Sequence, residues 1–176
     1  ISPDRVLKFD KKDNFWEMGE TGPCGPCSEI HYFIGDDIKS QSPGKVNSSD
    51  QYWELWNLVF IQHNRLSSGK LEDLSAMHVD TGAGFERIVA VMQGKLSNYS
   101  TDLFLPIIGK IESITGKSFN DDPVPFQVIS DHIRMLSFAI ADGALPSHEG
   151  RGYVLRRILR RAARFGRSLE TVLYPL

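Results

Sequence analysis

Residues 79–87 (VDTGAGFER) place an acid, two glycines and an arginine between a strand-like run and a helix-like run. Glycine lets the backbone approach a ligand closely, and the first turn of a helix presents free N–H groups to an anion. Asp80 is suited to holding an ammonium group, and Arg87 to holding a phosphate or a nucleotide base. The junction therefore predicts a binding turn for a ligand that carries both charges. A plain strand-to-helix turn remains an alternative, because Arg87 occupies the place of the third glycine of a dinucleotide fingerprint.

The patterns around this junction predict an α+β fold. Residues 52–62 (YWELWNLVFIQ) are rich in aromatic and β-branched side chains and predict a strand, which returns over 71–79 after a turn at 67–70. A helix is expected over 85–93, ended by Gly94. Further helices are expected over about 103–115, capped by Ser100, Thr101 and Asp102, and over 126–141 and 153–167.

A polar, proline-containing stretch at 120–125 (NDDPVP) reads as a linker. We therefore expect two domains, 1–122 and 123–176. The formal net charge of −2 is uneven, because residues 1–100 carry net −4 and residues 101–176 carry net +2. Seven arginines and no acid lie between Arg151 and Arg167, which predicts a polyanion partner for the second part only.

The segment 18–28 is rich in Gly, Pro and Cys and predicts an ordered loop. Cys24, Cys27 and His31 have a spacing that zinc sites use, but a structural site needs four ligands and no fourth has a matching spacing. The favoured interpretation is a rigid loop that lines a pocket, with zinc as the alternative. Two cysteines make no disulfide framework, so we expect a cytoplasmic protein. No apolar run approaches the roughly 20 residues that span a bilayer, so no membrane partner is expected.

Asn57 lies in an otherwise apolar strand, and a buried carboxamide must find hydrogen-bond partners. It either bonds a neighbouring backbone or faces a small polar substrate beside Asp80. On the last helix, Leu155, Ile158, Leu159, Ala162 and Phe165 recur at helical spacing and are expected to face a core. Like-charged arginines stack beside them, which favours nucleic acid over a merely solvated face. An acidic partner surface stays open.

Several long segments together resemble one family, the alanyl-tRNA synthetases. They are FWEMGETGPCGPCSEIHY (15–32), WNLVFIQHNR (56–65), VDTGAGFERI (79–88), SNYSTDLF (97–104), ISDHIRMLSFAIADG (129–143) and EGRGYVLRRILRRAARFGR (149–167). The resemblance implies part of a class II antiparallel sheet with flanking helices, followed by the start of a helical tRNA-recognition region. It implies a ligase that activates L-alanine with ATP and Mg²⁺ and transfers the alanyl group to tRNA(Ala).

The resemblance also implies roles for individual residues. Asp80 and Asn57 would bind alanine, in a small pocket shaped by Val59 and Gly82. Trp16 would border both alanine and ATP, and Arg87 would be the catalytic, ATP-contacting arginine of class II motif 3. The other residues expected at ATP are Leu55, Trp56, Asn57 and Gly84. The residues expected at tRNA are His148, Arg151, Arg156, Arg157, Arg160, Arg161 and Arg164.

Two features depart from the family's pattern. Class II motifs 1 and 2 are expected before Ile1, so we expect the chain to be a fragment with little activity alone. His148 stands where the family usually has an asparagine that reads the tRNA acceptor stem. Zinc is expected only in an editing domain that this chain lacks. A non-catalytic RNA-binding module remains the alternative to an enzyme, and the sequence does not indicate the oligomeric state.

Overall fold

The computed structural model describes residues 1–169, which divide into two compact units, one over Ile1–Leu96 and one that begins at Ser97. The division at Leu96 falls earlier in the chain than the predicted domain boundary at 122/123. That boundary, which separates a catalytic part from a tRNA-recognition part, stays a prediction. Within residues 1–169, no helix combines the length and apolar character needed to cross a bilayer.

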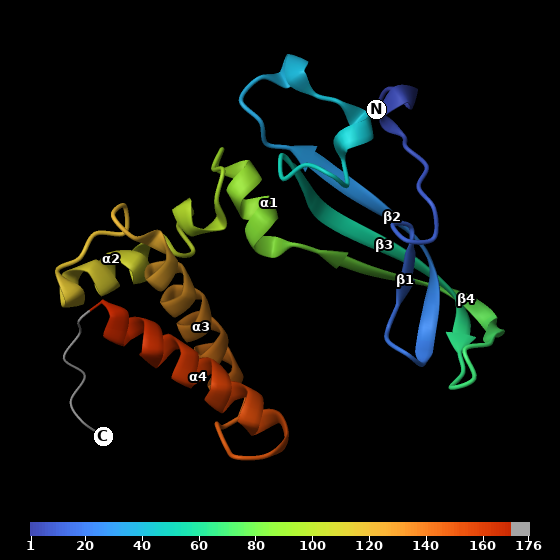
Figure 1. Cartoon of the computed structure of the whole chain (residues 1–176). Coiled ribbons are helices and arrows are strands. Elements are labelled where there is room, and N and C mark those ends of the chain that lie inside the picture. The colour runs from blue at the N-terminus through green and yellow to red at the C-terminus, as the bar shows by residue number, and fades with distance from the viewer. Residues whose placement is uncertain (170–176) are drawn as a thin grey trace. The chain divides into compact units, whose positions relative to one another are not determined.

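The first unit is built on an antiparallel sheet whose strands are neighbours in chain order, β1-β2-β3-β4 (Figure 1). The strands are β1 (Phe15–Glu17), β2 (Gly22–Phe33), β3 (Tyr52–Arg65) and β4 (Leu71–Ala83), followed by helix α1 (Phe85–Met92). Short 3₁₀ turns occur at Pro3–Arg5, Ile38–Ser40 and Pro43–Lys45. The predicted strands over 52–62 and 71–79 are confirmed and extend further than expected. The α+β class is confirmed as well.

The predicted loop over 18–28 is wrong for most of its length, because strand β2 begins at Gly22. Pairing with two neighbours overrides the local preference of its glycines and prolines. An irregularity between Cys24 and Cys27 lets Gly25 lie directly over β3, where a Cβ atom would stand 2.0 Å from the carbonyl oxygen of Phe60. At so short a distance between the two backbones, only glycine, which has no Cβ atom, can occupy position 25.

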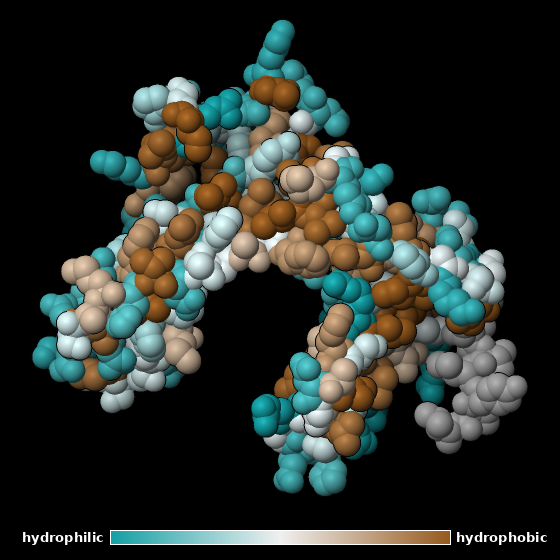
Figure 2. All heavy atoms as spheres, turned by 180° about the vertical axis from the view of Figure 1, so that it is seen from behind, coloured by the Kyte–Doolittle hydropathy of each residue, from teal (hydrophilic) through white to brown (hydrophobic). Residues whose placement is uncertain are grey.

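The register of the strands gives the sheet two different faces. One, which we call the polar face, carries Cys27, Glu29, Asn57, Val59, Asp80 and Gly82, because Glu29 pairs with Asn57, Asn57 with Gly82, Cys27 with Val59 and Val59 with Asp80. The other, the apolar face, carries Ile30, Trp56, Phe60 and Val79. These four side chains are 37% to 65% exposed. Apolar residues, drawn brown, do reach the molecular surface in Figure 2.

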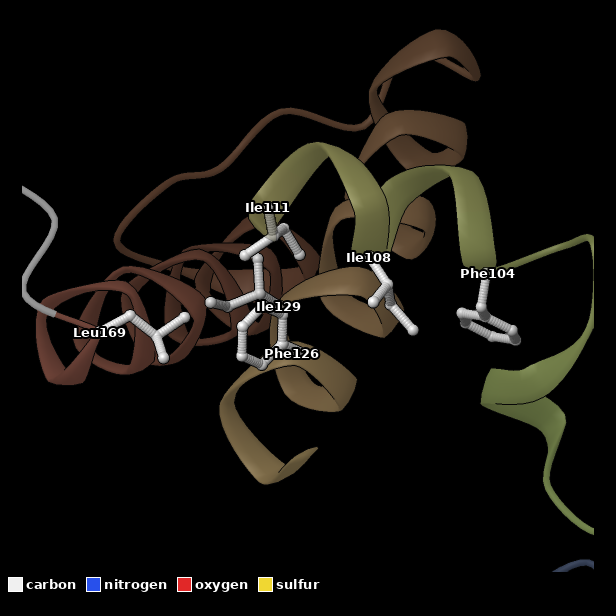
Figure 3. Close-up of a cluster of buried hydrophobic side chains, with 6 residues drawn as sticks. All are labelled: Phe104, Ile108, Ile111, Phe126, Ile129 and Leu169. Atoms are coloured by element: carbon white, nitrogen blue, oxygen red, sulfur yellow. The ribbon is translucent and has the colours of Figure 1, made fainter. Parts of the chain in front are cut away.

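The second unit is helical, with α2 (Leu105–Thr115), α3 (Pro123–Ala141) and α4 (Gly150–Ser168) following a 3₁₀ turn at Asn98–Ser100. Its core consists of Phe104, Ile108, Ile111, Phe126, Ile129 and Leu169 (Figure 3). Helices α3 and α4 pack against each other, as do α2 and α3.

The expected helices of this unit exist, but all three start at other residues than predicted, with α4 beginning at Gly150 rather than 153. Helix α3 begins at Pro123, so the second half of the predicted linker is its first turn, in which proline is tolerated. The expected cap at Ser100, Thr101 and Asp102 is wrong, because α2 begins after Phe104, which makes no side-chain cap bond. Thr101 is instead buried, and its hydroxyl donates to the carbonyl of Asn98 at 2.6 Å.

Candidate active site and nucleic-acid interface

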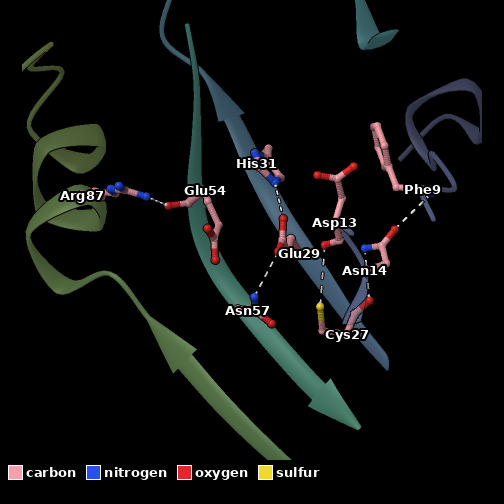
Figure 4. Close-up of polar contacts among 9 residues, drawn as sticks. All are labelled: Phe9, Asp13, Asn14, Cys27, Glu29, His31, Glu54, Asn57 and Arg87. Atoms are coloured by element: carbon pink, nitrogen blue, oxygen red, sulfur yellow. Dashed lines mark hydrogen bonds and ion pairs between the residues drawn. The ribbon is translucent and has the colours of Figure 1, made fainter. Parts of the chain in front are cut away.

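The junction between β4 and α1 is fixed to the neighbouring strand by two hydrogen bonds. The Gly84 N–H donates to the Leu55 carbonyl at 2.8 Å, and the Arg87 guanidinium donates to the Glu54 carbonyl at 2.7 Å (Figure 4). Helix α1 therefore begins close to the first residues of β3, and its first-turn N–H groups have no acceptor within the helix. The structure brings Arg87 and Gly84 to the Leu55 backbone, three of the positions predicted to meet ATP.

Four of the five positions predicted at alanine lie together on the polar face, and the fifth, Trp16, lies apart on β1. Asn57 faces Gly82 across the β3–β4 pair, and Val59 faces Asp80. Val59 is 6% exposed, whereas Asp80 is exposed. A Cβ atom built on Gly82 would meet no atom within 4 Å, so open space lies directly opposite Asn57. The two pairs thus place an amide and a carboxylate on the same open part of the polar face.

Glu29 bridges two side chains on this face, and sequence reasoning gave it no role. Its Oε1 accepts a hydrogen bond from Asn57 Nδ2 at 3.1 Å, and its Oε2 lies 2.9 Å from His31 Nε2 (Figure 4). Asn57 Oδ1 and His31 Nδ1 are buried, and neither has a hydrogen-bond partner among residues 1–169. The sequence contains one signal for Glu29: Cys27, Glu29 and His31 are two residues apart, as are residues on one face of a strand. This signal was missed because the segment was predicted to be a loop.

Cys27 is buried next to Glu29 on the polar face. Burial raises the pKa of its thiol above the ordinary value of 9.0, and the negative charge of Glu29 raises this pKa further. The N–H of Cys27 donates to the Asn14 carbonyl at 3.0 Å, and Asn14 Nδ2 donates to the Cys27 carbonyl at 3.2 Å. These bonds attach the segment before β1 to β2 and help to enclose a pocket of about 830 Å³ that Glu29 and His31 also line.

Cys24 and Cys27 are reduced, and both are buried. His31 lies on the same strand, where its Nε2 is occupied by Glu29. Among residues 1–169, no group of three or more His, Cys, Asp or Glu side chains is arranged to hold a metal ion. The geometry thus gives the alternative zinc hypothesis for Cys24, Cys27 and His31 no support.

Two predicted ATP positions are placed apart from the rest. Trp16 lies on β1 opposite Gly25, and β2 and β3 separate its strand from β4. The Trp56 side chain points to the apolar face, where its indole N–H donates to the hydroxyl of Thr81. Only the backbone of Trp56 is therefore available to a ligand on the polar face.

Helix α4 presents its arginines to solvent. Leu155 and Ala162 are buried as predicted, and Ile158 and Phe165 are partly buried, but Leu159 is 48% exposed and does not belong to the core. The arginines on this helix are all exposed: Arg151, Arg156, Arg157, Arg160, Arg161, Arg164 and Arg167. None of them forms an ion pair with an acid in the part of the chain that the structure describes.

Two of these arginines lie near aromatic rings of their own helix. The guanidinium of Arg157 lies 5.8 Å from the centre of the Tyr153 ring, and that of Arg161 lies 5.9 Å from the Phe165 ring. Such stacking restricts a guanidinium without neutralising its charge. His148 is exposed in the loop before α4, where Ser147 Oγ donates to the Glu149 carbonyl at 2.8 Å. Helix α4 thus presents an exposed cationic surface, and His148 lies in the loop before it.

Comparison with known sequences identifies the family. A sequence model described as tRNA synthetases class II (A) matches residues 1–173. The alanine--tRNA ligase of Chlorobium phaeobacteroides is 58% identical over 187 residues, which cover 100% of this chain and 21% of that protein. The alanine--tRNA ligase of Chlorobium chlorochromatii is 60% identical over 177 residues, 96% of this chain and 20% of the relative.

A more distant relative agrees with these two. The alanine--tRNA ligase of Christiangramia forsetii is 52% identical over 173 residues, which cover 94% of this chain and 20% of that protein. The chain thus spans about a fifth of the length of the curated relatives it matches. With nearly all of its residues matched by the family's sequence model, the chain belongs to the tRNA synthetases of class II (A).

Proposed function

We propose that this chain is part of an alanine--tRNA ligase and supplies the amino-acid side of its active site. The observation that supports this proposal most directly is that four residues share one face of the sheet: Asn57, Val59, Asp80 and Gly82. A carboxylate beside an amide suits an ammonium group, and the space left by Gly82 suits a short side chain. Three relatives that bear the name alanine--tRNA ligase support alanine as the amino acid.

The neighbouring junction supplies the nucleotide side. ATP is the energy source of class II synthetases, and Arg87, Gly84 and the Leu55 backbone lie together beside the proposed alanine site. In the proposed reaction an alanine carboxylate oxygen attacks the α-phosphorus of ATP, the bond to the β-phosphate oxygen breaks, and pyrophosphate leaves. Asp80 holds the ammonium group, and the Arg87 guanidinium compensates the phosphate charge.

The alanyl group then leaves the adenylate. A ribose hydroxyl at the 3′ end of tRNA(Ala) attacks the alanyl carbonyl carbon, the bond to the phosphate oxygen breaks, and AMP is released with the hydroxyl proton transferred to water. The exposed arginines of α4 are proposed to bind the backbone of the tRNA, with His148 at the acceptor stem. We place the protein in the cytoplasm, where its tRNA substrate is used.

Magnesium commonly accompanies ATP in such reactions. The residues of this chain do not form a cage for it, because no cluster of three candidate ligands occurs among residues 1–169. A Mg²⁺ ion that accompanies ATP takes most of its ligands from phosphates and water and needs only one or two carboxylates. We therefore assign no step to the metal.

The test is Asp80→Asn in the full-length parent enzyme. Loss of the carboxylate should lower alanine-dependent pyrophosphate exchange by about 100-fold, as expected for the loss of a charge-assisted hydrogen bond to the ammonium group worth about 3 kcal/mol. Asp73→Asn is the matched control, because Asp73 lies on the same strand with its side chain 89% exposed and paired with His63. Normal exchange in the Asp80 variant would refute the assignment.

A further inference from the structure

The amide of Asn57 has only one orientation that its surroundings accept. Glu29 and Asn57 face each other across the β2–β3 pair, and Glu29 Oε1 lies 3.1 Å from Asn57 Nδ2. A carboxylate accepts hydrogen bonds and does not donate them. If the amide were reversed, two oxygens would meet at this distance. Glu29 therefore turns the NH₂ group of Asn57 toward itself and the carbonyl oxygen away (Figure 4).

The second oxygen of Glu29 is held as well. His31 Nε2 lies 2.9 Å from Glu29 Oε2, with both side chains less than 20% exposed. His31 is the next residue on this face of β2, so the contact runs along the strand while the contact to Asn57 runs across it. Because each oxygen of the Glu29 carboxylate contacts a neighbouring side chain, one rotamer of Glu29 is favoured. This restrained carboxylate in turn restrains the orientation of the Asn57 amide.

The carbonyl oxygen that this arrangement turns away is buried and receives no hydrogen bond from any residue in 1–169. Such an acceptor is unfavourable until a donor reaches it. Gly82, directly opposite Asn57, contributes no side chain that could donate, and Asp80 on the same face offers a second acceptor. An ammonium group has three N–H donors, so it matches the two acceptors that Asn57 and Asp80 place on this one face.

We propose that Glu29 is a positioning residue for amino-acid recognition: it fixes Asn57 so that its carbonyl oxygen, together with Asp80, accepts hydrogen bonds from the ammonium group of the substrate. His31 restrains Glu29 in this role. The inference rests on the proposed function, because it takes the space beside Asn57 and Asp80 as the amino-acid site. The competing role for Glu29 is purely structural: as a brace, its hydrogen bond to Asn57 would only stabilise the pairing of β2 with β3.

The first experiment is Glu29→Gln in the full-length parent, measured by pyrophosphate exchange with alanine and ATP varied separately. A glutamine both donates and accepts, so it no longer dictates which end of the Asn57 amide faces it. The KM for alanine should rise about tenfold, as for one lost charge-assisted hydrogen bond, while the KM for ATP and the melting temperature change little. Glu72→Gln is the matched control, because Glu72 lies on β4 with a half-exposed side chain.

A second experiment reverses the donor and the acceptor. Asn57→Asp alone places two carboxylates against each other and should raise the KM for alanine strongly. In the double variant with Glu29→Gln, the new amide donates to the new carboxylate and leaves that group's other oxygen as an acceptor for the ammonium. We expect the double variant to have a lower KM for alanine than either single variant. A brace between strands predicts no such recovery.

The outcomes separate the inference from the function on which it rests. An unchanged KM for alanine in Glu29→Gln, with a raised one in Asn57→Ala, would overturn the role of Glu29 and leave the amino-acid site intact. A fall in melting temperature with alanine and ATP affected equally would overturn it in favour of the brace. Unchanged alanine kinetics in both Asn57→Ala and Asp80→Asn would instead overturn the proposed site itself.

Discussion

The sheet unit and the helical unit offer two different kinds of binding surface. The polar face of the sheet groups a few side chains whose positions follow from strand register, and its capacity to select a ligand depends on shape and hydrogen-bond direction. Helix α4 presents many exposed arginines of one charge, and its capacity to bind depends on their number. A single substitution on the polar face should therefore cause a large loss of ligand binding. On α4, each substituted arginine should cause only a small loss.

The core of the helical unit provides the largest expected effect. Phe126 is fully buried between α2 and α3 and lies edge-on to Phe119 at 5.9 Å between ring centres. Phe126→Ala should lower the free energy of unfolding by about 3–5 kcal/mol, because the substitution removes buried apolar atoms and leaves a cavity that the surrounding side chains fill only in part. Chemical denaturation of the chain measures the loss. Phe138→Ala on the same helix, where the ring is 68% exposed, should cost less than about 1 kcal/mol.

The space opposite Asn57 provides the next test, since a shape-dependent site should fail when it is filled. Gly82→Val in the full-length parent should lower kcat/KM for alanine by about 100-fold, because the side chain occupies the place of the substrate. The KM for ATP should stay within about threefold. Ser75→Val puts the same side chain on an exposed part of β4 and should be neutral. Equal losses in both variants would attribute the effect to the strand rather than to the site.

The arginine surface should respond gradually. Replacing Arg157 and Arg161 by glutamine should weaken tRNA binding about tenfold at moderate salt and reduce the slope of log affinity against log salt by about two. Filter binding at several salt concentrations measures both quantities. The same positions changed to lysine should keep the slope. If the glutamine variant binds with unchanged affinity and slope, α4 does not contact the nucleic acid.

Cys27 provides the smallest expected effect. Because its folded-state pKa is raised, the protonated thiol stabilises the fold at neutral pH. Above about pH 9 the unfolded chain releases this proton first, so the free energy of unfolding falls as pH rises, by at most about 1.4 kcal/mol per pH unit. Urea denaturation at pH 8 and pH 10 should show a smaller decrease for Cys27→Ala than for the unchanged chain. An equal decrease would mean that other groups cause the pH dependence.

The two units also differ in how much of them the sequence predicts. Strand β3 was predicted from its aromatic and β-branched side chains, and β4 from the turn that precedes it. Helices α3 and α4 were predicted from their helical sequence pattern. Strand β2 was missed because its glycines and prolines signal a loop locally, while its pairing with both β1 and β3 is a long-range property. The start of α3 was missed because Pro123 and Pro125 were interpreted as part of a linker. Proline disrupts the interior of a helix, but it is favourable in the first turn.

The candidate site shows the same division. Asp80, Gly82 and Arg87 could be identified because they are adjacent in sequence at a turn. That Asn57 and Asp80 share a face depends on the exact register of β3 and β4, which residue type alone does not determine. The link from Glu29 to Asn57 joins positions 28 residues apart and requires the correct assignment of β2. The roles of all these residues remain predictions that the substitutions above address.

The exposed apolar face of the sheet has a practical consequence. Strand β4 lies at the edge of the sheet, so one of its sides pairs with no strand among residues 1–169, and Val79 on its apolar face is 65% exposed. Edges of this kind readily recruit a second strand from another molecule. A recombinant product limited to these 176 residues should therefore tend to form inclusion bodies. Its expression would benefit from a solubilising fusion partner and low temperature.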